Sequence, residues 1–260
     1  MTDLNAFLPK LNKMVREEFQ LQEEVLKSHL LLDYNLKSRD LIDIIEKDDL
    51  IGFCEKMNLK KRGNVALNIM EAYKDSENLY IENYENIGFR ELNALKENGI
   101  IIKESELGLK FEDVTKSVFE KLGFQIDETL KKSLNTLKNK IDLVLNLEDE
   151  GLIIVECKTV KESGYNKFSS VSRQIKSYID LASSNGHNVV KSLLVAPDFS
   201  DDFVNDCDLD FELNLSLITA SSLSNILEAF KNSKLKQFPY QLLMKDILIK
   251  EDRIIKAINK

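Results

Sequence analysis

Two apolar runs joined by a short acidic turn constrain the fold of this chain more than any other feature. The sequence KIDLVLNL at residues 140–147 is followed by EDE and then by GLIIVECKT at residues 151–159. Side chains of an extended chain alternate between two faces, so Glu156 and Lys158 share one face of the second run. A hairpin between the runs would bring Asp142 beside them. Two carboxylates and a lysine at one place predict a Mg²⁺ site able to activate water and to stabilise a phosphoryl transition state.

An ordinary ion pair on a water-facing strand is the alternative interpretation of Glu156 and Lys158. The run LIIV at residues 152–155 argues against it, because a continuous apolar run is typical of a central strand covered on both faces. Charged groups in such a strand are costly unless they have partners or a task. The pattern therefore favours a functional site over a solvated strand.

This arrangement resembles the PD-(D/E)XK nuclease superfamily, whose pattern is an acidic residue at one strand and Glu-x-Lys on the next. Asp142 and the sequence from Glu156 to Lys158 carry the resemblance, and Ile141 stands where the family pattern has proline. The resemblance implies an α/β restriction-endonuclease-like core, in which a central mixed β-sheet is flanked by helices. It also implies that Asp142, Glu156 and the carbonyl of Cys157 hold one or two Mg²⁺ ions, for which Mn²⁺ can substitute. Lys158 would then act on the attacking water and on the charge developing at phosphorus.

Flanking segments extend the resemblance over roughly residues 106 to 230. A helix expected to end near Gly123 carries Glu112, which would complete the metal site, although a first-turn acid favoured by the helix dipole is an equal alternative. Gln174 and Tyr178, four residues apart on a helix expected over 171–182, resemble the Q-x-x-x-Y element of RecB-like nucleases. Tyr178 packed in the core and a solvated Gln174 form the competing interpretation. Residues 163–167 resemble the cleavage domains of type IIS restriction enzymes, and further strands are expected at 192–197 and 213–219.

Charge is distributed unevenly along the chain. The net charge is −8, yet residues 131–176 contain nine Lys or Arg against six Asp or Glu. A basic face on an acidic body is compatible with a phosphate-bearing substrate, although a solvated lysine loop gives the same count. The expected nucleic-acid contacts in this part of the chain are Lys140, Lys161, Arg173 and Tyr178.

Other classes of protein are disfavoured by composition. Three widely spaced cysteines and two histidines argue against a disulfide framework, a zinc site and a cysteine–histidine nucleophile pair. No apolar run approaches the length needed to cross a bilayer, and no signal peptide is evident at the start. These features favour a cytoplasmic protein without a membrane partner.

Residues 1–104 are expected to form a helical accessory domain before a nuclease domain at 105–260. Helical spacing begins at Leu4 and is expected to run toward Leu30, and Ser38 and Asp48 are candidate N-caps of shorter helices. A helix, a glycine stop and a strand are expected over 88–102. The basic turn formed by Lys60, Lys61 and Arg62 faintly resembles a SAP-type helix–turn–helix module that contacts DNA phosphates. A solvated turn between amphipathic helices is the simpler alternative.

The sequence thus predicts a Mg²⁺-dependent endonuclease acting on DNA, in the setting of restriction or defence against foreign DNA. Substrate and setting follow from family analogy alone. An RNA nuclease and a nuclease-fold binding subunit without activity are the alternatives. A second copy of the chain is a further expected partner, and the N-terminal helices would form the dimer contact.

Overall fold

The computed structural model describes residues 4–21, 38–72, 76–135, 140–162 and 164–259. The chain divides into two compact units, Met1–Leu79 and Tyr80–Lys260. The boundary expected from the sequence lay later, between residues 104 and 105. Segment 80–104 groups with the C-terminal unit because its helix α7 (Tyr84–Gly88) packs against α9 (Leu107–Lys121) and α13 (Ala220–Lys231).

The described part of the N-terminal unit is helical, as predicted. Its helices are α1 (Leu4–Glu18), α3 (Ser38–Asp43), α4 (Lys47–Lys56), α5 (Val65–Ala72) and the start of α6 (Ser76–Glu82). A small core between α3, α4 and α5 contains Cys54, Val65 and Ile69, with Ile42, Leu50, Ile51 and Leu59 packed around them. This core holds α4 and α5 on either side of the basic turn.

Two N-terminal predictions need correction. The first helix does not continue from Leu4 toward Leu30 but ends at Glu18, where Gln20 takes a left-handed backbone with φ 52°. The predicted extension over residues 22–30 lies outside the described residues. Helix α4 begins earlier than expected, with Glu46 at the N-cap, so Asp48 lies inside the first turn. An acid there still interacts favourably with the helix dipole.

The C-terminal unit is built on a five-stranded mixed sheet in the order β1-β2-β3-β4-β5. Its strands are β1 (Gln125–Ile126), β2 (Leu143–Asn146), β3 (Leu152–Cys157), β4 (Val189–Ala196) and β5 (Leu215–Thr219). The first three strands pair antiparallel, whereas β3, β4 and β5 are parallel. Every residue of β3 is buried, which is typical of a central strand. The predicted hairpin and the two later strands are therefore confirmed.

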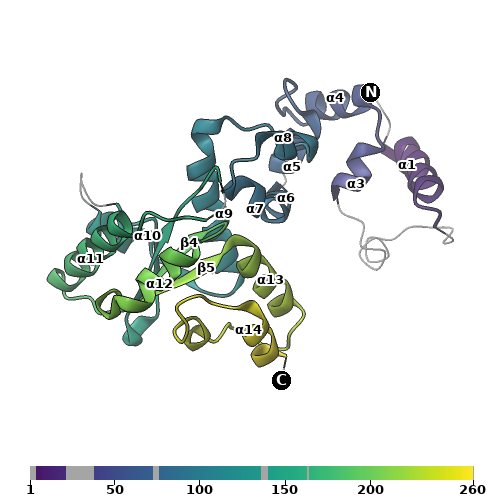
Figure 1. Ribbon diagram of the computed structural model, residues 1–260. Helices are drawn as coiled ribbons and strands as arrows, with labels where there is room; N and C mark the ends of the chain where they lie inside the picture. The colour runs from purple at the N-terminus through teal and green to yellow at the C-terminus, as the bar shows by residue number, and fades with distance from the viewer. Residues whose placement is uncertain (1–3, 22–37, 73–75, 136–139, 163, 260) are drawn as a thin grey trace. The chain divides into compact units, whose positions relative to one another are not determined.

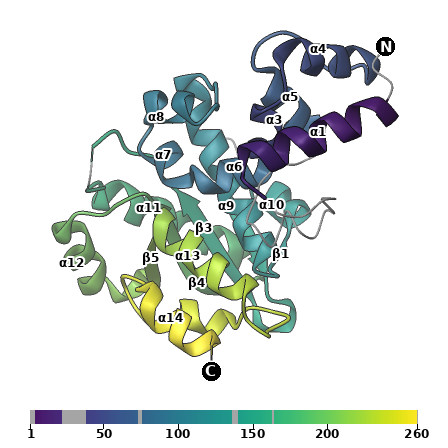
Figure 2. The same ribbon diagram turned by 90° about the vertical axis from the view of Figure 1, so that its right-hand side faces the viewer.

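Helices cover both faces of this sheet (Figures 1 and 2). Helix α9 packs on β3, α13 packs on β5 and α9, and α11 (Phe168–Ser184) packs on β4. The remaining helices of the unit are α8 (Leu92–Glu97), α10 (Glu128–Leu134), α12 (Asp201–Leu209) and α14 (Glu251–Ile258). Short 3-10 turns are Glu104–Glu106, Glu148–Glu150, Phe211–Leu213 and Tyr240–Leu243. The predicted α/β fold, a mixed sheet flanked by helices after a helical N-terminal part, is confirmed.

Alternation along β3 sorts its side chains between the two layers of helices. Ile154 packs with Tyr178 of α11, whereas the Cys157 thiol interacts with Thr115 of α9. Full burial of one large apolar side chain contributes about 1.5–3 kcal/mol to folding. A strand covered on both sides is therefore firmly held, and its two faces are chemically distinct.

Some local predictions for the C-terminal unit are confirmed and one is wrong. Gly123 has a φ of 90°, in agreement with the predicted left-handed helix end. The strand expected at the end of 88–102 does not form, although α8 and the glycine stop at Gly99 do. Among the described residues, no helix is both long and apolar enough to cross a bilayer. All three cysteines are free and buried.

Two helical glycines of the C-terminal unit provide a stability test. A Cβ on Gly88 would lie 2.8 Å from the Phe111 ring and 3.0 Å from Pro197, whereas a Cβ on Gly108 would meet nothing within 4 Å. Gly88→Ala is expected to lower the free energy of unfolding by about 1–3 kcal/mol because the Phe111 ring is buried and cannot withdraw freely. Gly108→Ala should raise it by up to about 1 kcal/mol. Urea unfolding measures both, and equal effects would contradict the tight approach at Gly88.

Candidate active site

The antiparallel register of β2 and β3 brings the first carboxylate to the second. Leu143 pairs with Val155, so Asp142, one residue before β2, lies opposite the end of β3. The Asp142 Oδ2 atom accepts a hydrogen bond of 2.7 Å from the backbone N–H of Cys157. That bond fixes the carboxylate of Asp142 next to Glu156. The convergence of the two acids predicted from the sequence is confirmed.

Glu156 is a carboxylate buried in the central strand, with only 1% of the residue exposed. Its Oε1 atom accepts hydrogen bonds from Lys158 Nζ and, at 2.9 Å, from Gln174 Nε2. Its Oε2 atom is buried and has no hydrogen-bond partner among the described residues. Burial and the neighbouring charge of Asp142 raise the pKa of Glu156 to about 7. The site thus contains a buried carboxylate oxygen without a partner among the described residues, in a side chain that interacts with a second carboxylate.

Lys158 lies directly after β3 and points to the same face as Glu156. Burial by itself would lower the pKa of the Lys158 ammonium, but the Glu156 carboxylate outweighs this effect and raises it. The Gln174 Oε1 atom lies 3.3 Å from Lys158 Nζ. Gln174 therefore contacts both charged groups through opposite ends of its amide. The alternative of a solvated Gln174 is wrong.

Tyr178 occupies a different place from that predicted. It is 1% exposed and packs in the core with Ile154, so it is not a surface contact for nucleic acid. Its hydroxyl donates to the carbonyl of Lys140 at 2.5 Å and contacts the amide of Gln174. Burial and the charge of Glu156 raise the pKa of this phenol, which keeps it a donor. Tyr178 thus connects Gln174 to the backbone that precedes Asp142.

Glu112 of α9 lies near the two acids without joining them in one cluster. Burial and the charge of Asp142 raise the pKa of Glu112 to about 7. Burial also raises the pKa of Asp142, while the N–H of Cys157 and the charge of Lys158 oppose that rise. No group of three His, Cys, Asp or Glu side chains within ligand distance of one point occurs in the described part of the chain. The closely placed carboxylates are those of Asp142 and Glu156, and Glu112 interacts electrostatically with Asp142.

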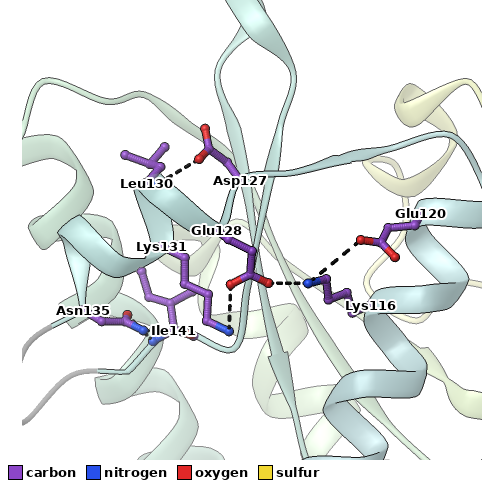
Figure 3. A network of polar contacts seen from close by, with 8 residues as sticks. All are labelled: Lys116, Glu120, Asp127, Glu128, Leu130, Lys131, Asn135 and Ile141. Carbon is purple, nitrogen blue, oxygen red and sulfur yellow. Dashed lines mark hydrogen bonds and ion pairs between the residues drawn. The ribbon is translucent and has the colours of Figure 1, made fainter.

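Helix α10 and its C-cap residue Asn135 contact the segment that leads to Asp142, and Figure 3 draws Asn135 bound to Ile141. The Asn135 amide forms two bonds to the backbone of Ile141, accepting from its N–H at 2.8 Å and donating to its carbonyl at 3.3 Å. Lys131 of the same helix interacts electrostatically with Asp142 and lies 4.0 Å from Glu128. Glu128 is also bound by Lys116 of α9 at 2.6 Å. Sequence analysis missed Lys131 and Asn135, because neither belongs to a short pattern and only the fold brings them to Asp142.

The remaining predicted contacts lie at the surface. Lys140, Lys161 and Arg173 are exposed, and Arg173 Nε donates to the carbonyl of Ser169 in its own helix at 3.0 Å. Lys161 pairs with Glu104 at 2.5 Å. All of these cations are accessible to a ligand.

The predicted basic turn of the N-terminal unit is exposed and has a defined shape. The side-chain amide of Asn68 in α5 donates to the carbonyls of Lys60 at 2.7 Å and Arg62 at 3.0 Å. Lys61 pairs with Glu55 at 2.6 Å. Because one amide holds the backbone at both ends, the three cationic side chains project from an ordered turn.

No family model and no curated protein matches the sequence. The restriction endonuclease FokI is similar in structure. The similarity has a TM-score of 0.46 and 13% sequence identity, and covers 79% of this chain and 34% of the FokI chain. This chain thus spans about a third of the length of that enzyme.

The raised pKa values predict a pH-dependent stability in the absence of divalent ions. The folded protein binds more protons than the unfolded chain between the ordinary glutamate pKa of 4.5 and about 7, so the free energy of unfolding should fall as pH rises through this interval. Glu112→Gln and Glu156→Gln should each reduce that fall. Chemical unfolding in chelator at both ends of the interval measures it.

Glu120→Gln is the matched control, because Glu120 is an exposed glutamate on the same helix as Glu112. It should leave the pH dependence of stability as in the wild type. A fall of equal size in all four proteins would show that neither Glu112 nor Glu156 takes up a proton on folding in this range.

Proposed function

We propose that this chain is a metal-dependent nuclease that hydrolyses phosphodiester bonds, with DNA as substrate, in restriction or defence against foreign DNA. The observation that carries the proposal is the buried pair Asp142 and Glu156, with the Glu156 Oε2 atom unpartnered among the described residues and Lys158 beside it. Leaving a buried carboxylate oxygen unsatisfied costs several kcal/mol of desolvation unless a ligand compensates for it. A divalent cation matches that need, because hard cations prefer carboxylate oxygens.

Asp142 and Glu156 would hold the cation, with the carbonyl of Cys157 as a third ligand and Glu112 as an outer one. A bound Mg²⁺ or Mn²⁺ supplies a hydroxide at neutral pH and stabilises negative charge on the phosphoryl oxygens. Metal binding also offsets the carboxylate repulsion that raises the pKa of Glu156.

Lys158 would act mainly as a donor. Since Glu156 raises the pKa of its ammonium, Lys158 is protonated at neutral pH and can orient the attacking water and stabilise charge developing at phosphorus. Gln174 holds Lys158 and Glu156 at fixed positions through its amide. Positioning of this kind supports catalysis by keeping the reacting groups in a productive geometry.

Incubation of the pure protein with Mg²⁺ and labelled duplex DNA, single-stranded DNA and RNA tests the proposal. Cleavage of DNA is expected, and it should disappear in Asp142→Asn and in Glu156→Gln because each removes one negative ligand. In Asp142→Asn the new side-chain amide oxygen can still accept the Cys157 N–H, so the fold is retained. Thermal stability without metal should hold or rise, since the carboxylate repulsion is relieved.

Lys158→Ala separates the roles of lysine and metal ligands. Turnover should fall by a factor on the order of 10² or more, while Mg²⁺ affinity measured by calorimetry persists. Full activity in Asp142→Asn would overturn the assignment of the site, and cleavage of RNA alone would replace DNA as the substrate.

The basic turn of the N-terminal unit is proposed to contact DNA phosphates. Replacing Lys60, Lys61 and Arg62 together with Ala should weaken duplex binding and flatten its salt dependence, because fewer counterions are released. Hydrolysis of a short oligonucleotide at saturation should change little. The matched control replaces three exposed lysines of the C-terminal unit, Lys231, Lys234 and Lys236. Equal effects of the two triple replacements on duplex binding would show that the turn is only a solvated loop and not a DNA contact.

A further inference from the structure

Arg90 is held in an unusual conformation beside the candidate active site. It follows α7 with a φ of 62°, a left-handed backbone that residues other than glycine rarely adopt. Its guanidinium donates to Thr159 Oγ1 at 3.1 Å and to the carbonyl of Glu104 at 2.9 Å. The Nε atom is buried and has no hydrogen-bond partner among the described residues. Backbone strain and an unused donor at one residue are features that cluster at functional sites.

Arg90 lines a cavity of about 430 Å³, called here the Arg90 cavity. A cavity of this size falls in the range of ordinary ligand sites. Three of the lining residues are cationic and one, Glu162, is anionic, so the net charge of the wall is positive. The cationic residues are Arg90, Lys161 and Lys167, and the wall also contains Thr159, Tyr165 and Asn166.

The Arg90 cavity adjoins the catalytic hairpin. Thr159, in its wall, directly follows Lys158. Tyr165, also in its wall, interacts electrostatically with the Lys158 ammonium and packs edge-on against Phe203 at 5.3 Å between ring centroids. A ligand in the cavity would therefore lie next to the group that acts on the scissile phosphate.

Two cations of this cavity converge on a single carboxylate oxygen. Glu104 Oε1 lies 2.5 Å from Lys161 Nζ and 3.8 Å from Arg90 Nη2. Glu104 is half exposed, so the interaction is weak and readily exchanged. Phosphate oxygens favour the same partners, and arginine is especially suited to binding phosphate through two donors.

We infer that the Arg90 cavity binds a phosphodiester group of the substrate strand next to the scissile bond. Glu104 pairs with Arg90 and Lys161 until nucleic acid displaces it. The inference rests on the proposed nuclease function and adds a second phosphate site to it. Arg90 anchors the phosphate from one side and Lys161 from the other. Because Arg90 is already fixed by Thr159 and by the Glu104 carbonyl, little conformational entropy is lost on binding.

Binding can be measured without cleavage in the full chain carrying Asp142→Asn. A fluorescently labelled short DNA duplex is titrated in chelator, and its anisotropy gives the Kd. Arg90→Gln is expected to raise the Kd about tenfold, the equivalent of one hydrogen bond to a charged group, and to lower the salt slope by about one. Glu104→Gln should lower the Kd, because it removes the competing carboxylate.

Arg253→Gln is the matched control. Arg253 is an arginine of α14 that also pairs with a carboxylate, Asp246 at 2.5 Å, but does not line the cavity. Its replacement should leave the Kd unchanged. Thermal unfolding checks that Arg90→Gln is folded. If Arg90→Gln does not fold, Lys161→Gln, which changes an exposed residue, is expected to weaken duplex binding in the same way.

The outcomes separate this inference from the proposed function. If the wild-type chain shows metal-dependent cleavage but Arg90→Gln and Lys161→Gln leave duplex binding unchanged, the cavity assignment is overturned. The proposed nuclease function is then retained. Absence of cleavage by the wild-type chain, together with absence of duplex binding by the chain carrying Asp142→Asn, would overturn both. A labelled mononucleotide that binds as tightly as the duplex, and depends on Arg90, would show a pocket for free nucleotides and overturn the strand assignment.

Discussion

The burial of the Glu156 carboxylate in the central strand is the interaction on which the C-terminal unit depends. Moving an unpaired carboxylate into a protein interior is prohibitive, so the group must be neutralised or bound. Lys158 and Gln174 satisfy one of its oxygens and leave the other open. The fold therefore contains a local electrostatic defect that a proton or a cation can relieve. Such defects are typical of active sites, where stability is exchanged for function.

Three helices hold the hairpin that carries this defect. Asn135, at the end of α10, binds the backbone of Ile141, and Tyr178 of α11 binds the carbonyl of Lys140. Thr115 of α9 interacts with the Cys157 thiol from the opposite face. None of these links uses a side-chain oxygen of Asp142 or Glu156, and each acts within two residues of one of these acids. Sites supported in this way keep their geometry because the surrounding side chains are locked by packing.

The sequence was most informative where the relevant contacts are local. Alternation along one strand and a short turn were enough to place Asp142, Glu156 and Lys158 together, since a hairpin register follows from few residues. Helical spacing likewise placed Gln174 and Tyr178 on one face, but it could not show that Tyr178 is enclosed by the core. Asn135 and Arg90 escaped notice because each reaches the site through tertiary packing. The strand expected near residue 100 failed because an apolar run alone does not provide a partner strand.

The connectivity of the sheet has a further consequence for the order in which the chain folds. Strands β2 and β3 are joined by a five-residue connection, whereas β4 and β5 reach the sheet only after the crossover helices α11 and α12. Short-range pairings form early, and parallel pairings across long connections form late. Asp142 and Glu156 therefore meet before Gln174 arrives to donate its hydrogen bond to Glu156. Their repulsion is expected to slow the folding step, so a cation bound at the proposed metal site should accelerate folding more than it slows unfolding.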